Sequence, residues 1–287
     1  MTGYIGFRLM LALFSIIPFW LLYGMSDLLF LVLYYLVGYR KAVVRENLSR
    51  SFPNMTEQEL KRLEVKFYRH LADIFLEGIK GLTLSDKETI RRYKVLTPDA
   101  PNLPFRAGQA SLFVGSHYNN WEYGALGCGL QVEPLAIVFY KPIKNKKIEN
   151  YVRDKRQRKG TYFAPLNETS KTFVDLLPQS PMFIMLADQS PSNPKASHWV
   201  QFLNQDTPVL HGPAKYAQRY DLPIYLIRTR KAKRGFYEVS AELIIEKPNE
   251  LAAEEISAAF MAKLEELILE QPEYWLWSHK RWKHKRS

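Results

Sequence analysis

The chain has 287 residues, of which 47% are hydrophobic and 14% aromatic, so it can build one large domain or two small ones, and disorder is excluded as the default. Its single cysteine, Cys128, excludes an internal disulfide framework and favours a reducing compartment. A formal charge of +11 favours an anionic partner, which by composition alone is lipid head groups, nucleic acid or an acidic carrier protein.

The N-terminus is apolar. Residues 9–25 carry no charge, Asp27 interrupts, and a second apolar run covers residues 28–38. A spanning helix needs about 20 apolar residues, so we expect either one tilted span or a hairpin within one leaflet. A signal peptide is disfavoured because no small-x-small cleavage site follows. Two buried helices of a soluble bundle are the alternative.

Basic residues follow this segment at once, and they place the main body on the cytoplasmic side of a membrane. We therefore expect a membrane anchor over residues 1–39 and a folded domain over residues 40–287. The four basic residues nearest the anchor are Arg40, Lys41, Arg45 and Arg50.

The next elements are predicted from caps and periodicity. Thr56 and Glu59 form a capping box that starts an amphipathic helix running to about Gly81. A short strand is expected over residues 93–96 and a buried strand over residues 110–115. A helix over residues 122–130, a strand over 135–140 and a basic helix-like segment over 141–160 follow.

In the second half, strands are predicted over residues 161–165, 182–187, 223–230 and 236–245, the last antiparallel to its neighbour after a turn at 231–235. Helices are predicted over residues 170–177, 212–220 and 250–269, before an aromatic and basic end. This alternation predicts an α/β fold with a mixed, partly parallel central sheet flanked by helices.

Functional residues in such sheets lie beyond the carboxyl ends of strands, where His117, Tyr140 and Asp188 are found. His117 is a candidate general base, and Glu122, five residues later, is a candidate to orient its ring. Asn120 adds a polar donor. Asp188 is expected either to bind a basic group in the site or to cap a helix. The alternative for His117 and Glu122 is a structural one, in which the histidine packs in the core and the glutamate lies on the surface.

Sequence motifs for nucleotide, serine-nucleophile and metal chemistry are absent from the sequence. The sequence has no phosphate-binding GxxxxGKS loop, no GxSxG elbow and no His or Cys cluster with metal-ligand spacing. We therefore expect acid–base catalysis without a metal or cofactor. Nine basic residues within 141–159 suit either lipid phosphates or an acidic carrier protein, the alternative being a solvated helix face. Among them are Lys141, Arg156 and Arg158.

Residues 117–122, His-Tyr-Asn-Asn-Trp-Glu, resemble the H-x4-D/E motif of glycerolipid acyltransferases, and most closely that of the bacterial lipid A late acyltransferases (lauroyl and myristoyl transferases of the inner membrane). The resemblance covers nearly the whole chain. It includes residues 140–142 (Tyr-Lys-Pro), the Arg-x-Arg at Arg156 and Arg158, Asp188-Gln189, residues 211–214 (His-Gly-Pro-Ala) and the C-terminal Trp-x-Trp-x-His-x-Arg-Trp at 275–282.

The resemblance implies O-acyl transfer from an acyl thioester, carried by acyl carrier protein or coenzyme A, to a lipid hydroxyl at the cytoplasmic face of the bacterial inner membrane. His117 would be the base and Glu122 its orienting group. Substrate or oxyanion contacts would come from Asn120, Tyr140, Lys141, Arg156, Arg158, Asp188 and Gln189.

Two departures affect the choice of substrate but not the reaction class. Lys141 stands where arginine is common, and Asp188-Gln189-Ser190 lacks the His-Asp form seen in some lauroyl transferases. Within the class, another glycolipid, a lysophospholipid or an aminolipid is the rival acceptor. The rival of another class is a non-catalytic, membrane-tethered protein that binds anionic lipid. Nucleic acid is disfavoured, because no binding motif is found and the anchor argues against it.

Overall fold

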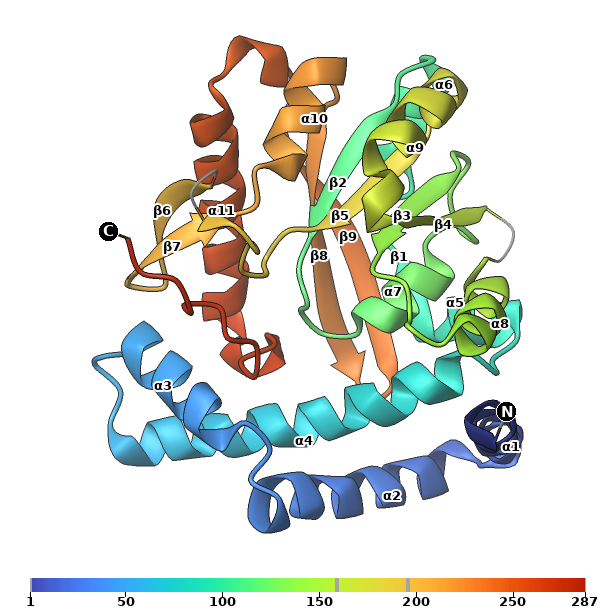
Figure 1. Cartoon of the computed structure of the whole chain (residues 1–287), viewed down its shortest axis with the longest axis vertical. Helices are drawn as coiled ribbons and strands as arrows, with labels where there is room; N and C mark the ends of the chain where they lie inside the picture. Colours follow the sequence, from blue (N-terminus) through green and yellow to red (C-terminus); the bar gives the residue numbers. More distant parts are fainter. Residues whose placement is uncertain (1, 158–159, 195–196, 287) are drawn as a thin grey trace.

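The computed structural model describes residues 2–157, 160–194 and 197–286. At its centre is a seven-stranded sheet with the strand order β1-β9-β8-β2-β5-β3-β4 (Figure 1). Five neighbouring strands, β8 to β4 in that order, are parallel, whereas β9 is antiparallel to β8 and parallel to β1. The predicted mixed, partly parallel sheet is confirmed. The strands are β1 (Tyr93–Val95), β2 (Ser111–Gly115), β3 (Ala136–Tyr140), β4 (Thr161–Pro165), β5 (Met182–Leu186), β8 (Ile224–Lys233) and β9 (Phe236–Ile245).

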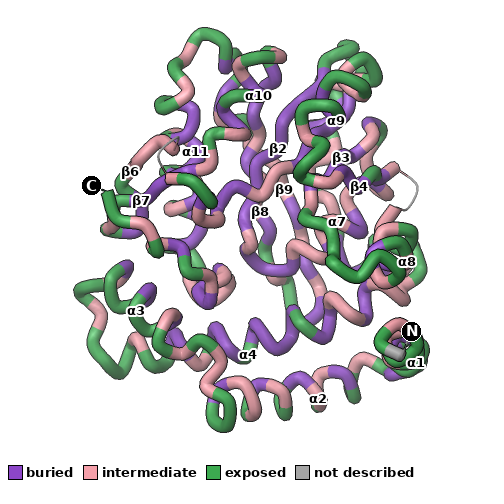
Figure 2. Tube along the Cα trace, in the orientation of Figure 1, coloured by how far each residue is buried: buried purple, intermediate pink, exposed green. Residues whose placement is uncertain are grey.

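Helices cover both faces of the sheet because the buried strands are apolar on both sides. In β2, Leu112 and Val114 join a core shared with α9 (Thr169–Leu176), α10 (Gly212–Tyr220) and α11 (Ala253–Glu270). Phe113 points to the opposite face, as alternation along a strand requires. That second face is covered by α6 (Asp99–Arg106) and α7 (Trp121–Gly127). The strands are mostly buried, whereas the N-terminal helices are mostly exposed (Figure 2).

A long helix, α4 (Glu57–Gly81), runs along the edge of this assembly and starts at the predicted Thr56–Glu59 capping box. The N-terminal helices α1 (Thr2–Ile16) and α2 (Phe19–Leu31), with a π-helical turn at Val32–Leu36, pack on α4 (Figure 1). One helix in the described part of the chain, Phe19–Leu36, is long and apolar enough to cross a membrane by length and composition. The remaining α-helices of the described residues are α3 (Lys41–Ser51), α5 (Asp86–Arg92) and α8 (Lys146–Arg156).

Several predicted boundaries differ from the structure. Helix α8 covers only residues 146–156 of the basic segment, since Asn145 caps its start by accepting hydrogen bonds from the next turn. The hairpin of β6 (His198–Phe202) and β7 (Gln205–Val209) was not predicted. Its two-residue turn places Leu203 and Asn204 at positive φ, and leucine gives no sequence signal for such a turn.

Candidate active site

His117 lies just beyond the carboxyl end of β2, and Asp188 just beyond that of the neighbouring strand β5. The two strands are paired in register up to Gly115 and Leu186, so the residues that follow them meet. His117 Nδ1 lies 2.8 Å from Asp188 Oδ1, and the His117 backbone N–H donates to Oδ2 at 2.9 Å. Since a carboxylate only accepts, Nδ1 carries the hydrogen and Nε2 is left as the basic nitrogen.

Asp188 therefore orients the imidazole, which is the role predicted for Glu122. Glu122 instead accepts a hydrogen bond from Arg156 Nη2 at 2.5 Å. The prediction that Glu122 holds the His117 ring is wrong in this respect. It rested on nearness in sequence, whereas the partner of Nδ1 comes from an adjacent strand 71 residues away.

The ionisation of this pair follows from burial and charge. Burial of the ring acts to lower the pKa of His117, but the charge of Asp188, its hydrogen bond and the charge of Glu122 together raise that pKa above its ordinary value. Burial acts to raise the pKa of Asp188, but His117 and the hydrogen bonds it receives hold that pKa below its ordinary value. The aspartate is thus kept ionised beside a histidine whose charged form is favoured.

A cavity of about 620 Å³ is lined by His117. Its walls are mixed, and we call it the polar cavity because charged side chains line it together with apolar ones. Gln189 lines it, and its side-chain amide nitrogen is 3.2 Å from His117 Nε2. The cavity brings together six of the predicted site residues: His117, Glu122, Tyr140, Lys141, Arg156 and Gln189. Sequence reasoning did not single out Lys215, which lines the same cavity from α10. Arg158 lies outside the described residues.

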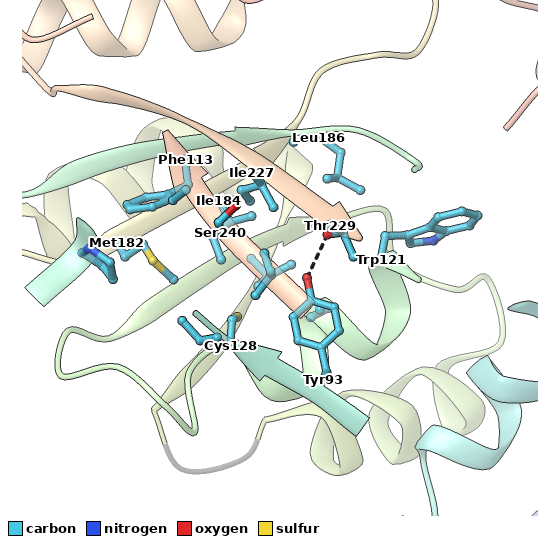
Figure 3. Close-up of a pocket in the computed structure, with 18 of the residues that line it drawn as sticks. Tyr93, Phe113, Trp121, Cys128, Met182, Ile184, Leu186, Ile227, Thr229 and Ser240 are labelled. Carbon is cyan, nitrogen blue, oxygen red and sulfur yellow. Dashed lines mark hydrogen bonds between the residues drawn. The ribbon is translucent and has the colours of Figure 1, made fainter. Parts of the chain in front are cut away.

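A second, apolar cavity of about 100 Å³ lies between the sheet and α7 (Figure 3). Trp121, Ala125, Val138 and Leu186 line both cavities, so the two adjoin there. Met182, Ile184 and Leu186 point into the apolar cavity from alternate positions of β5. The apolar cavity therefore runs alongside β5 for about 13 Å, from Leu186 back to Met182, because each residue of a strand adds about 3.3 Å. We call it the apolar slot.

The described residues contain no group of three or more His, Cys, Asp or Glu side chains that could hold a metal ion. Comparison with known families gives a match over residues 2–284, to the model described as bacterial lipid A biosynthesis acyltransferase. The chain belongs to this family. No curated protein matches the chain. Membership makes the protein an acyltransferase of lipid A biosynthesis, and it implies an acyl donor and a lipid acceptor.

The aromatic C-terminal segment contacts Asp188. Trp275 donates from its indole Nε1 to Asp188 Oδ2 at 2.9 Å, and its backbone pairs with Tyr118. Leu276 N–H donates to the His117 carbonyl at 3.1 Å, so the segment lies directly against the loop that follows β2. Sequence reasoning expected the C-terminal tryptophans to pack or to contact membrane, and it missed this hydrogen bond. The indole completes the set of donors around Asp188.

His279, whose role the sequence left open, is half-buried near the same carboxylate. Burial lowers its pKa to about 4, with the charges of Arg281, His117 and Lys283 acting in the same direction and that of Asp188 opposing them. It is therefore neutral at physiological pH. Of the two histidines, His117 is the one that lines the polar cavity.

Asn120 does not face the cavity, so the predicted substrate or oxyanion contact is wrong for this residue. It is fully buried, and its side-chain oxygen accepts the Tyr123 N–H at 2.8 Å and so caps α7. Its amide nitrogen donates to Glu77 Oε2 at 2.6 Å. Glu77 also accepts from Tyr237 at 2.8 Å and from Tyr23 of α2 at 3.0 Å. Asn120 thus positions the helix that carries Trp121 and Glu122.

Replacing Asp188 with asparagine is expected to move the acid limb of the pH profile of kcat/KM to lower pH. The limb reports loss of the His117 proton, and removing the carboxylate charge removes stabilisation of the imidazolium. Glu122→Gln should move it less, because that carboxylate acts on the ring only through its charge. The measurement is kcat/KM against pH for both variants. A larger shift in Glu122→Gln would restore Glu122 as the partner of the ring.

Replacing Glu77 with glutamine is expected to flatten the pH dependence of stability. Burial, followed by the charge of Asp73, raises the pKa of Glu77 from 4.5 to about 7. The folded chain then binds the extra proton between these values, so this group makes stability fall as pH rises, by roughly 3 kcal/mol in total. Urea unfolding at pH 5 and pH 8 should show a smaller difference in the variant. An unchanged difference would rule out Glu77 as the source.

Proposed function

We propose that the protein is an O-acyltransferase that moves a fatty acyl chain from an acyl thioester, carried by acyl carrier protein or coenzyme A, to a hydroxyl of a lipid A precursor. The observation that carries this proposal is the His117–Asp188 pair at the place where a polar cavity adjoins an apolar slot. The two substrates need these two environments: a sugar or hydroxyacyl group needs polar walls, and an acyl chain needs an apolar channel.

The reaction begins at Nε2 of His117, the ring nitrogen that carries no hydrogen. His117 Nε2 takes the proton of the acceptor hydroxyl after the hydroxyl displaces the Gln189 amide. The oxygen attacks the thioester carbonyl carbon and forms a tetrahedral oxyanion. Collapse of this intermediate breaks the carbon–sulfur bond, and the imidazolium gives its proton to the departing thiolate. The products are an ester and a thiol, and Asp188 stabilises the imidazolium in between.

Arg156 is our candidate for stabilising the oxyanion. It lines the polar cavity, and its pairing with Glu122 holds the guanidinium in one orientation beside Phe163. A preorganised donor of this kind is worth on the order of 10²–10³-fold in rate. Lys141 and Lys215, at the walls of the same cavity, suit the phosphate groups of the acceptor or the acidic surface of a carrier protein.

The apolar slot is our candidate for the acyl chain. Its walls are side chains of a packed sheet, including Phe113, Val138 and Ile184, so its length is set by rigid elements. The thioester carbonyl would lie at the junction near Trp121, whose ring stands edge-on to the His117 ring at 5.2 Å. We further propose that residues 1–39 hold the enzyme to the cytoplasmic face of the bacterial inner membrane, with residues 40–287 carrying catalysis.

The test is an assay of the purified protein with acyl carrier protein or coenzyme A thioesters and a lipid A precursor that has free hydroxyacyl hydroxyls. Mass spectrometry should show a gain of one acyl ester, with release of one thiol. Transfer only to a lysophospholipid, another glycolipid or an aminolipid would show that the acceptor is wrong. Binding of anionic lipid without turnover of either thioester would show a non-catalytic binding protein.

A further inference from the structure

Helices α1 and α2 and the π-helical turn at Val32–Leu36 expose a row of large apolar side chains. Ile16, Trp20 and Leu36 are each at least 75% exposed, which is unusual for residues of this size. The row continues along the same segments, and we call it the apolar row. Its other members are Ile5, Leu9, Leu13, Leu21, Leu28, Leu31, Tyr35 and Val37.

The opposite side of α2 is bound to the catalytic domain through polar groups. Ser26 donates to the buried Asp73 of α4 at 2.8 Å. Arg234, in the turn between β8 and β9, donates to Asp73 and to Asp27 at 2.7 Å each. Tyr23 donates to Glu77. Figure 1 shows α2 running beside α4, which agrees with these contacts.

The corner between α1 and α2 is held by a buried lysine. Lys80 Nζ donates to the carbonyl oxygens of Phe14 at 2.7 Å and of Ser15 and Ile17 at 2.9 Å. These carbonyls belong to the end of α1, where a cation is favoured. Pro18 follows at once, and α1 is seen end-on in Figure 1 whereas α2 lies across the view. The two helices therefore form a bent unit that cannot act as one continuous span.

We infer that α1, α2 and the following turn lie in the plane of a single membrane leaflet, and that this segment does not cross the bilayer. At 15 residues, α1 is shorter than the roughly 20 that a span requires. If α2 crossed the bilayer in its observed position, it would carry Asp73, Glu77 and Arg234 into hydrocarbon with it, which is costly. If it crossed alone, it would leave the buried Asp73 and Lys80 without these partners.

Basic residues at both ends of the apolar row specify an anionic bilayer as the partner. At one end, Arg8 stacks on Tyr151 of the basic helix α8, with its Cζ 4.4 Å from the ring centroid. At the other end, Lys41 lies over Tyr34 and Arg69 over Phe30. An apolar face flanked by cations is the pattern of helices that lie in the interface of a membrane with anionic lipids. This inference rests on the proposed membrane location.

The test is labelling with a membrane-impermeant maleimide in sealed vesicles of either orientation that contain the full-length protein. Gly3→Cys reports the start of α1, where an added side chain meets no atom within 4 Å. Glu265→Cys reports a partly exposed position on α11 in the catalytic domain. The unaltered chain gives the background from Cys128. We expect both new cysteines to be labelled from the cytoplasmic face only.

Two results would overturn the inference while leaving the proposed function in place. One is labelling of Gly3→Cys only from the face opposite to Glu265→Cys, which would mean a span. The other is protection of Gly3→Cys from both sides until detergent is added, which would put the chain end in hydrocarbon. Recovery of the protein in the soluble fraction would instead overturn the membrane location itself, and the inference with it.

A second measurement tests the lipid contact by flotation with vesicles that contain or lack an anionic phospholipid. Leu36→Glu puts a charge on the apolar row and should lower the bound fraction at least about tenfold, equivalent to 1.4 kcal/mol. Leu36→Ile is the matched control and should bind as the unaltered chain does. Equal binding of Leu36→Glu, or binding independent of anionic lipid, would show that the row or its basic ends do not contact the bilayer as inferred.

Discussion

Replacing His117 with alanine is expected to lower kcat for acyl transfer by about 10²–10⁴-fold, the usual contribution of a positioned general base. KM for either substrate should change little, because the proton is transferred only in the transition state. Folding should survive, since the side chain is partly exposed at a strand end and its removal opens no closed core. The measurement is a steady-state assay with the thioester and the lipid acceptor.

The matched control for this prediction is His211→Ala. His211 is a second histidine that lines the same polar cavity, but it lies at the start of α10 on another wall. Its loss should reduce activity far less than loss of His117, because no carboxylate corresponding to Asp188 orients it in the arrangement described above. If the two variants lost the same activity, the effect would come from cavity shape, and if His117→Ala kept full activity, the general-base assignment would be wrong.

Replacing Cys128 with phenylalanine is expected to shorten the acyl chain that the enzyme prefers. Cys128 lines the apolar slot but not the polar cavity, and Figure 3 shows it on the side of Met182, away from Trp121. A ring added there removes room for the far end of the chain and leaves the catalytic end unchanged. Each excluded methylene is worth about 1–3 kcal/mol, or about 10–200-fold in kcat/KM.

The measurement is competition among thioesters of increasing chain length, with products separated by mass. In Cys128→Phe, kcat/KM should fall for the longest chains and stay near the unaltered value for the shortest. Cys128→Ser changes the atom and keeps the size, so its length profile should match that of the unaltered enzyme. A uniform loss over all lengths would mean that the substitution damages the fold, and an unchanged profile would mean that the acyl chain lies elsewhere.

Much of the fold can be predicted from local pattern because its signals are strong over short windows. The antiparallel pair β8 and β9 was expected from alternation on both sides of a basic turn, and it was found. The capping box at Thr56 and Glu59 was likewise expected and found. The hairpin of β6 and β7 was missed because its turn residues are Leu203 and Asn204, where a glycine-containing pair would have given a signal.

The candidate site was predicted only in part, for a physical reason. Local sequence identified His117, and the order of strands in the sheet decided its partner. Strand β2 lies next to β5, so Asp188 reaches the imidazole, whereas α7 turns Glu122 toward Arg156. Similarly, Asn120 caps α7 and is buried against Glu77 of a distant helix. Contacts between segments far apart in sequence leave little trace in either segment alone.

The support of Asp188 by Trp275 has a consequence for how the enzyme comes into being. The His117–Asp188 pair receives one of its hydrogen bonds from a residue 87 positions after Asp188. Folding during synthesis proceeds from the N-terminus, so α1 and α2 emerge from the ribosome well before this tryptophan. A growing chain thus makes His117 and Asp188 well before the residue that donates to the Asp188 carboxylate, and the pair gains its full set of hydrogen bonds only after residue 275 has left the ribosome.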